Sequence, residues 1–266
     1  MTVIVTDEQA EAFAAALYNA RRDRQPIAAF TEAQPDLGME DGYAIQTRLV
    51  RMLLADGETI SGYKLGLTSA AMQQLLGVDS PDFGPVFAST VYNDGVEIPV
   101  DRFIAPRIEA EIGVILGEDL TGPHCTPADA RQASRGLVAA LEIVDSRIKD
   151  WKIKLADTVA DLASNGAIAL SSQVVPVDGL DPRLIGMVFT RNGEVVATGA
   201  GAAALGDPMA AVAWLANTLA PMGVTLPAGS VIMTGALHAM VPVTPGDVFR
   251  ADFDRLGPIT IRMAKE

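Results

Sequence analysis

The sequence predicts an α+β protein, in which a few helices are segregated from a larger number of short β-strands. Hydrophobic residues make up 49% of the 266 residues, enough for a substantial core. Helical spacing of apolar residues dominates the first 55 residues, and short apolar runs separated by Gly and Pro follow from residue 60. We therefore expect a helical N-terminal arm at residues 1–58 and a β-rich domain carrying the functional site at residues 59–266. The two should form one continuous structural unit.

Two helices are expected in the N-terminal arm. Thr6 and Gln9 fit a capping box, which predicts a helix that ends near the charged cluster at residues 21–24. A second helix is expected over residues 39–55, with Gly57 just past its end. The spacing of Tyr43, Thr47, Val50 and Leu54 suggests that they share its inward face.

Further along, short β-like runs alternate with turns. Asn192-Gly193 between two such runs predicts a hairpin with a type I′ turn. Thr126-Pro127 and Asp207-Pro208 are helix starts, and these helices should end near Gly136 and before Gly223. The expected strands cover residues 61–67, 86–90, 96–100, 106–116, 136–144, 168–170, 187–190, 195–198, 231–234, 248–253 and 259–263.

The net charge of −13 argues against a nucleic acid or an anionic membrane surface as partner. Cys125 is the single cysteine, so no intrachain disulfide is possible. Residues 1–8 lack a basic stretch followed by an apolar one, and no apolar run reaches the length of a membrane span. We expect a cytoplasmic protein.

Three glutamates stand out in the β-rich part. Glu109 and Glu111 lie two apart in an apolar run, so on a strand they point to the same face. Glu142 lies within another, almost wholly apolar run, where a bare carboxylate would be very costly. Three carboxylates with open positions would suit Mg²⁺ or Mn²⁺. The alternative is that Glu109 and Glu111 face solvent while Glu142 pairs with nearby Arg147 or Lys149.

Other chemical motifs carry less weight. Lys64 lies between Gly62 and Gly66, which suggests close approach of backbone or ligand, although a strand lysine can also reach solvent. Residues 199–204 resemble the glycine-rich sequence of a dinucleotide-binding loop, but no βαβ unit surrounds them. We therefore expect a close-packing or mobile segment. His124, His238 and Cys125 have no motif partners. Residues 161–166 read as an ordinary helix end.

Several motifs occur in order along the chain: Gly62-Tyr63-Lys64-Leu65-Gly66-Leu67-Thr68-Ser69, Pro81-Asp82-Phe83-Gly84, Pro106-Arg107-Ile108-Glu109-Ala110-Glu111, Glu142-Ile143-Val144-Asp145-Ser146-Arg147-Ile148, Asp157-Thr158-Val159-Ala160-Asp161, Thr198-Gly199-Ala200-Gly201 and Thr234-Gly235-Ala236. Together they resemble the 2-hydroxypenta-2,4-dienoate (2-keto-4-pentenoate) hydratases and 4-oxalocrotonate decarboxylases of aromatic meta-cleavage pathways. These enzymes belong to the fumarylacetoacetate hydrolase superfamily. The resemblance covers nearly the whole chain and implies a mixed β-roll with helices outside.

The resemblance also implies roles for individual residues. It implies that Glu109, Glu111 and Glu142 bind Mg²⁺ or Mn²⁺, and that Lys64 is an active-site group for proton transfer or carboxylate binding. It also implies that Asp82 lies in the substrate pocket, where we expect it to be catalytic by orienting or deprotonating water. The expected substrate-binding residues are Leu65, Ser164, Thr234 and Gly235. It further implies a 2-hydroxydienoate or 2-oxo acid substrate and a homo-oligomer, which could associate with a paralogous decarboxylase or a downstream aldolase.

Two positions depart from the family pattern. Leu162 stands where members usually have Asn, and Tyr63 stands where several carry a basic or aliphatic residue. Residues 82–84, 91–93 and 147–152 look closer to the hydratases, so a hydratase is expected. A decarboxylase, a C–C hydrolase and a non-enzymatic organic-acid-binding protein are the alternatives.

Overall fold

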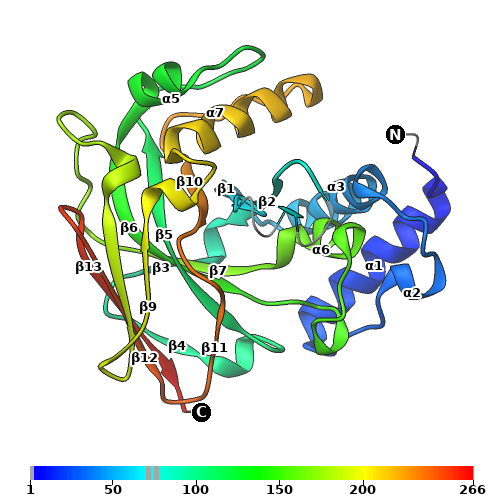
Figure 1. Cartoon of the computed structure of the whole chain (residues 1–266). Helices are drawn as coiled ribbons and strands as arrows, with labels where there is room; N and C mark the ends of the chain where they lie inside the picture. Colours follow the sequence, from blue (N-terminus) through cyan, green and yellow to red (C-terminus); the bar gives the residue numbers. More distant parts are fainter. Residues whose placement is uncertain (1–2, 70–72, 75–77, 266) are drawn as a thin grey trace.

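The computed structural model describes residues 3–69, 73–74 and 78–265. Four of its helices gather at one side of the molecule and two lie together at another (Figure 1). The first group is α1 (Asp7–Asp23), α2 (Phe30–Ala33), α3 (Met39–Ala55) and α6 (Leu155–Ala160). The second is α5 (Pro127–Ala133) and α7 (Pro208–Leu219). Within the described ranges no helix is both long and apolar enough to cross a membrane.

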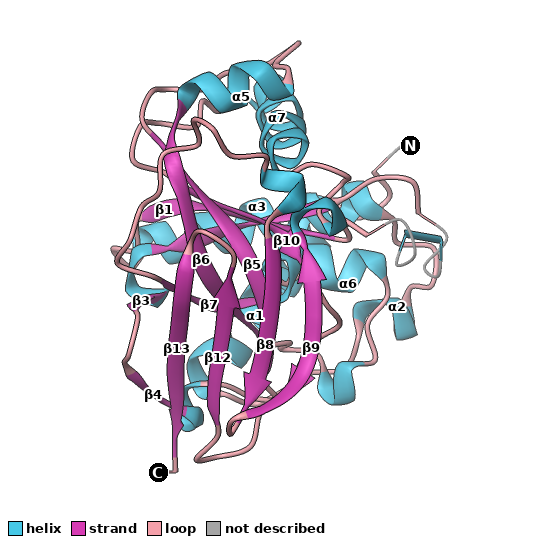
Figure 2. Ribbon diagram, turned by 60° about the vertical axis from the view of Figure 1, so that its left-hand side comes forward, coloured by secondary structure: helices cyan, strands magenta, loops and turns pink. Residues whose placement is uncertain are grey.

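The strands form two sheets. The larger sheet has the order β2-β1-β10-β5-β6-β7-β3, with β11 paired to β5, and the smaller has the order β4-β13-β12-β8-β9. Figure 2 shows β13, β12, β8 and β9 lying side by side. The strand bounds are β1 (Ile60–Gly66), β2 (Asp82–Phe87), β3 (Val91–Asn93), β4 (Glu97–Pro99), β5 (Arg107–Leu116), β6 (Ser134–Val144), β7 (Asn165–Leu170), β8 (Gly186–Arg191), β9 (Glu194–Ala200), β10 (Val231–Ala236), β11 (Val241–Pro242), β12 (Val248–Phe253) and β13 (Gly257–Ala264).

The main core joins the two sheets and α7. Ile112 on β5, Phe189 on β8 and Leu215 on α7 belong to one buried apolar cluster. Because strand side chains alternate, this cluster uses one face of β5 and β6 and leaves their other face free for different contacts. Each large apolar side chain removed from water contributes about 1.5–3 kcal/mol to stability.

A second core belongs to the helical group. Leu17 of α1 and Leu49 of α3 pack with Phe87 of β2, Ala160 of α6 and Leu162. The N-terminal helices thus share a core with residues far along the chain.

Several expected elements are confirmed. The capping box of Thr6 and Gln9 begins α1, and the second helix has the predicted bounds, Met39–Ala55. Asn192 and Gly193 have φ of 56° and 86°, as a type I′ turn requires. Gly199 lies in a close-packed segment as expected, because a Cβ there would lie 2.3 Å from the Leu237 carbonyl oxygen.

Other expectations were wrong in detail. The buried face of α3 carries Ile45, Leu49 and Leu53, whereas Leu54 is 44% exposed. The helix expected to reach Gly136 ends at Ala133, because β6 already pairs with β5 from Ser134. The strand expected at residues 86–90 instead covers Asp82–Phe87, and residues 88–90 form a 3₁₀ turn.

Candidate metal centre

The three glutamates come together because of strand register. Glu109 on β5 lies directly opposite Glu142 on β6, and Glu111 follows two residues later on the same face. One carboxylate oxygen from each residue lies within 4.8 Å of the other two. Glu111 and Glu142 are fully buried and Glu109 is half-buried. The predicted cluster of carboxylates is therefore present in the fold.

The hydrogen bonds of these carboxylates leave oxygens unsatisfied. Glu111 Oε2 accepts a 2.8 Å bond from the Gly235 amide, and Glu142 Oε1 accepts a 3.2 Å bond from Asn165 Nδ2. Glu111 Oε1 and Glu142 Oε2 are buried without a partner among the residues that the structure describes. Buried carboxylate oxygens in this state require a cation or a proton.

The electrostatics of the cluster also indicate that the carboxylates need a cation or a proton. Burial and then the charge of Glu142 raise the pKa of Glu109 to about 8. The same causes, with a contribution from Glu109, raise the pKa of Glu111 well above its ordinary value. An all-carboxylate donor set in a cramped buried cluster fits a hard divalent cation, for which Mg²⁺ and Mn²⁺ are the natural candidates.

Lys64 on β1 reaches the same cluster. Its Nζ donates a 2.9 Å hydrogen bond to the Ala163 carbonyl and lies 3.3 Å from Glu142 Oε1. Burial alone would lower the pKa of Lys64, but Glu142 and then Asp82 outweigh burial and raise it. Lys64 is therefore a buried ammonium ion beside the carboxylates, not a lysine that extends to solvent.

Asp82 begins β2 opposite Gly66 of β1. Its Oδ1 is buried and has no hydrogen-bond partner in the described part of the chain, and burial raises the pKa of Asp82 although Lys64 opposes that shift. A Cβ on Gly66 would lie 2.1 Å from Asp82 Oδ1, so only glycine leaves room for this carboxylate. The glycine flanking Lys64 thus has a specific structural role.

The turn between α6 and β7 completes the surroundings of Lys64 and Glu142. Leu162, Ala163 and Ser164 have φ of 58°, 50° and 55°, a left-handed conformation that is costly for residues with a Cβ. It holds the Ala163 carbonyl against Lys64 and leads into Asn165, which contacts Glu142. Strain of this kind is often found at functional sites.

The comparison with known families follows from this geometry. A family model described as the fumarylacetoacetate (FAA) hydrolase C-terminal region matches residues 62–264. This chain belongs to the fumarylacetoacetate hydrolase family. The matched region contains every residue of the candidate centre described above.

Similar proteins from this family include two hydratases. The 2-keto-4-pentenoate hydratase of Paraburkholderia xenovorans is 46% identical over 255 residues, which cover 96% of this chain and 95% of that protein. The 2-oxo-hept-4-ene-1,7-dioate hydratase of Escherichia coli is 39% identical over 252 residues, which cover 92% of this chain and 94% of that protein.

A solved structure confirms the expected fold of the family. The 4-oxalocrotonate decarboxylase from Pseudomonas putida G7, complexed with magnesium and adipate, matches with a TM-score of 0.94 and 37% identity. The match covers 98% of this chain and 100% of that chain. The expected α+β class, with a fumarylacetoacetate hydrolase-like mixed β-roll and outer helices, is confirmed.

The four expected substrate-binding residues lie at different depths around the centre. Gly235 contacts Glu111 directly through its amide, and the Thr234 hydroxyl donates a 2.8 Å bond to the Ile112 carbonyl. The Ser164 hydroxyl lies 3.1 Å from Thr158 Oγ1. The Leu65 side chain packs in the main core, on the strand face opposite Lys64, so only its backbone is available to the site.

The alternative pairing of Glu142 does not occur. Arg147 instead forms a buried ion pair with Asp161, with Nε 2.5 Å from Oδ1. Its Nη1 donates a 3.0 Å bond to the Asn165 carbonyl. His238 accepts a 2.9 Å bond from the Ala110 amide and stacks on Phe189 in the core. His238 therefore contributes to packing and does not contact the three glutamates of the centre.

Sequence reasoning missed Ala163 and Asn165. The helix end expected at residues 161–166 is present, since α6 ends at Ala160 and Asp161 caps it, but the left-handed turn and the start of β7 at Asn165 were not expected. The only available signal was the polar pair Ser164-Asn165 ahead of an apolar strand, and that pattern is also typical of a helix end.

Proposed function

We propose that this protein is a divalent-metal-dependent hydratase. It would add water to 2-hydroxypenta-2,4-dienoate, or to a substituted analogue, and release a 4-hydroxy-2-oxo acid. The observation that carries the proposal is the buried triad of Glu109, Glu111 and Glu142, with unpaired oxygens and the Lys64 ammonium beside it. The hydratase relatives at 46% and 39% identity support this choice of reaction.

The three glutamates would hold Mg²⁺ or Mn²⁺. When bound, the metal would supply a Lewis acid for the 2-oxygen and carboxylate of the substrate. Three carboxylate ligands leave other coordination positions for substrate oxygens. The magnesium complex of the decarboxylase structure supports this assignment.

Lys64 and Asp82 would move protons. Lys64 holds a proton on Nζ because its carboxylate neighbours raise its pKa, so it can donate that proton to the far carbon when the dienol ketonises. Asp82 has a free Oδ1 that can accept a proton from the attacking water. Burial raises the pKa of Asp82 and makes it a stronger base than an exposed aspartate.

The remaining expected residues would position the substrate. The Gly235 amide orients Glu111, and a Cβ on Gly235 would lie 2.0 Å from Thr68 Oγ1, which keeps this turn free of side chain. Ser164, Thr234 and the backbone of Leu65 are proposed to line the substrate pocket.

The test is an ultraviolet assay of dienol loss with Mg²⁺ or Mn²⁺, with CO₂ measured in parallel. Dienol loss without CO₂, abolished by Glu142→Gln in a folded protein, is the expected result. Full activity of that variant in chelated buffer would contradict the metal assignment. Binding of the dienol without turnover would instead indicate an organic-acid-binding protein.

A second candidate reaction is decarboxylation of 4-oxalocrotonate. The structural match to 4-oxalocrotonate decarboxylase, with a TM-score of 0.94, is the observation that favours it. In that reaction the enolate forms by CO₂ loss and no water is activated. Stoichiometric CO₂ release from 4-oxalocrotonate, unaffected by Asp82→Asn, would favour the decarboxylase.

We also propose a homo-oligomer. Edge strand β9 exposes Val195 by 62% and Val196 by 44%, and neighbouring Val188 on β8 is 41% exposed. An unpaired edge with apolar side chains supports association between copies. Light scattering of the purified protein tests it, and a monomer at all concentrations would contradict it.

A further inference from the structure

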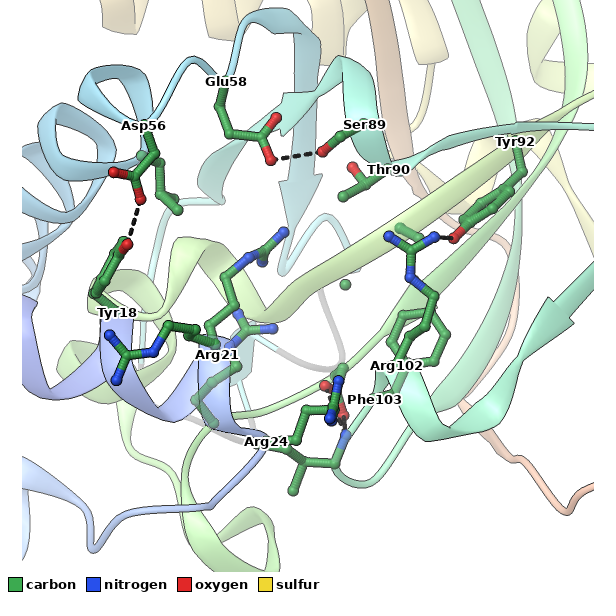
Figure 3. A pocket seen from close by; sticks show the side chains of 17 residues that line it. Tyr18, Arg21, Arg24, Asp56, Glu58, Ser89, Thr90, Tyr92, Arg102 and Phe103 are labelled. Atoms are coloured by element: carbon green, nitrogen blue, oxygen red, sulfur yellow. Dashed lines mark hydrogen bonds between the residues drawn. The ribbon is translucent and has the colours of Figure 1, made fainter. Parts of the chain in front are cut away.

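A pocket of about 300 Å³ lies apart from the carboxylate centre (Figure 3). Its walls come from the end of α1, the connection between α3 and β1, the segment joining β2 to β3, the loop at residues 102–104, and the adjoining ends of β6 and β7. None of the three glutamates lines it, and neither Lys64 nor Asp82 does. The pocket therefore needs its own explanation.

The charge of the pocket is opposite to that of the chain. The whole protein carries −13, whereas the lining holds five arginines against three acidic residues, a formal charge of +2. The lining arginines are Arg21, Arg22, Arg24, Arg102 and Arg147. Such a concentration of guanidinium groups in a hollow is typical of anion recognition.

The acidic residues of the pocket are already engaged elsewhere. Asp56 accepts a hydrogen bond from the Tyr18 hydroxyl, and Glu58 accepts a 2.7 Å bond from the Ser89 hydroxyl (Figure 3). Asp145 accepts bonds from the amides of Ile104 and Ala105. These contacts fix the carboxylates in place, and although Glu58 and Asp145 still attract Arg21, the lining keeps its formal charge of +2.

Arg21 is a half-buried cation of the lining, whereas Arg24 beside it is exposed. Arg22 pairs with Asp23, Arg102 lies over the Tyr92 ring, and Arg147 pairs with Asp161. Within the described residues, the Arg21 guanidinium has no hydrogen bond or ion pair. Burial, followed by repulsion from Arg147, lowers its pKa to about 10, so it still carries its charge at neutral pH.

We propose that this pocket binds a small anion through carboxylate or phosphate oxygens. Arg21 presents several guanidinium N–H donors in a fixed fork, whereas Arg147 adds positive charge to the wall while its Nε, Nη1 and Nη2 donate to Asp161 and Asn165. The side chains of Arg24 and Arg102 add charge at the rim. The volume suits a small metabolite, which is bound mainly by charge and hydrogen bonds.

The test is calorimetric titration of the magnesium-loaded, full-length protein with inorganic phosphate and, separately, with succinate at constant ionic strength. Saturable binding of either anion is expected, and the tighter of the two identifies the oxyanion class. Arg21→Gln should weaken binding about tenfold or more, as the loss of a charge-assisted bond predicts. Arg51→Gln is the matched control, because Arg51 is exposed on α3 and lies outside the pocket.

Two further variants keep the outcome interpretable. Glu142→Gln should bind the anion as the wild type does, since Glu142 belongs to the other centre. Arg102→Gln removes an exposed rim charge, so it tests the pocket even if Arg21→Gln fails to fold. Arg102→Gln should weaken binding several-fold.

Three results would overturn the proposal. One is the absence of saturable binding with both anions. Another is binding that survives both Arg21→Gln and Arg102→Gln but disappears in Glu142→Gln, which would place the anion at the carboxylate centre. The third is dissociation of an oligomer by Arg21→Gln with no anion binding in the wild type, which would mean that a second copy fills the pocket.

Discussion

The ion pair between Lys64 and Glu142 gives the sharpest test of the candidate centre. The Lys64 Nζ lies 3.3 Å from Glu142 Oε1, and the two side chains are only 4% and 0% exposed. At an effective dielectric constant of 20, such a separation corresponds to about 5 kcal/mol of attraction. Removing one partner of a buried pair typically costs about 3–5 kcal/mol, because the other charge is left uncompensated.

We therefore expect a strong coupling in a double-mutant cycle. Lys64→Met should lower the free energy of unfolding by about 3–5 kcal/mol in chelated buffer at pH 7. The double variant Lys64→Met/Glu142→Gln should be about 2 kcal/mol more stable than the sum of the single effects predicts. Urea unfolding with analysis of both midpoint and slope measures these values.

The control and the contrary result are both clear. Lys152→Met removes the charge of an exposed lysine, so its effect should stay within about 0.5 kcal/mol. If the effects of Lys64→Met and Glu142→Gln add within about 0.5 kcal/mol, the two residues do not form a coupled buried pair. The assignment of Lys64 as an ammonium ion held beside the carboxylates would then lose its physical basis.

Three further predictions follow from the geometry. Burial and then Glu142 raise the pKa of Glu109 to about 8, so below that pH a cation must displace its proton. Magnesium affinity should therefore rise as the pH approaches 8, and calorimetry in two buffers of different ionisation heat should detect the released proton. Gly66→Ala places a Cβ 2.1 Å from Asp82 Oδ1 and should lower turnover about tenfold or more by displacing this base. Gly186→Ala, where nothing lies within 4 Å, should leave turnover unchanged. Ala163→Gly relieves a left-handed φ of 50° and should change stability by less than about 1 kcal/mol while lowering turnover, which thermal unfolding and steady-state kinetics will measure.

The sequence predicts the three glutamates of the candidate centre better than it predicts their arrangement. Alternation along one strand indicates that Glu109 and Glu111 share a face, and the apolar surroundings of Glu142 indicate that it needs a partner. Strand register is different, because nothing local specifies that Glu109 lies opposite Glu142. The ordered family motifs supplied that juxtaposition as an expectation.

At Asp82 and at residues 162–164, the backbone conformation could not be predicted from the sequence. Asp82 lies in Pro81-Asp82-Phe83-Gly84-Pro85, which reads locally as a turn, yet it begins a strand because β1 pairs with it along its length. The left-handed turn at residues 162–164 contains no glycine, so residue type gives no warning of it. In both places tertiary contacts override local preference.

The N-terminal helices explain how these two unexpected segments are held. Gln46 of α3 is buried and donates bonds of 3.0 Å to the Phe83 carbonyl and 2.7 Å to the Val159 carbonyl. Phe83 directly follows Asp82, and Val159 lies in the helix that leads into the turn at residues 162–164. Leu162, where the family usually has Asn, packs into the apolar cluster of α1 and α3. Because burial of Leu162 offsets the cost of its left-handed backbone, the helical arm holds both Asp82 and the Ala163 carbonyl beside Lys64. The sequence pattern changes at residue 58, but residues on both sides of that boundary hold the candidate centre in place.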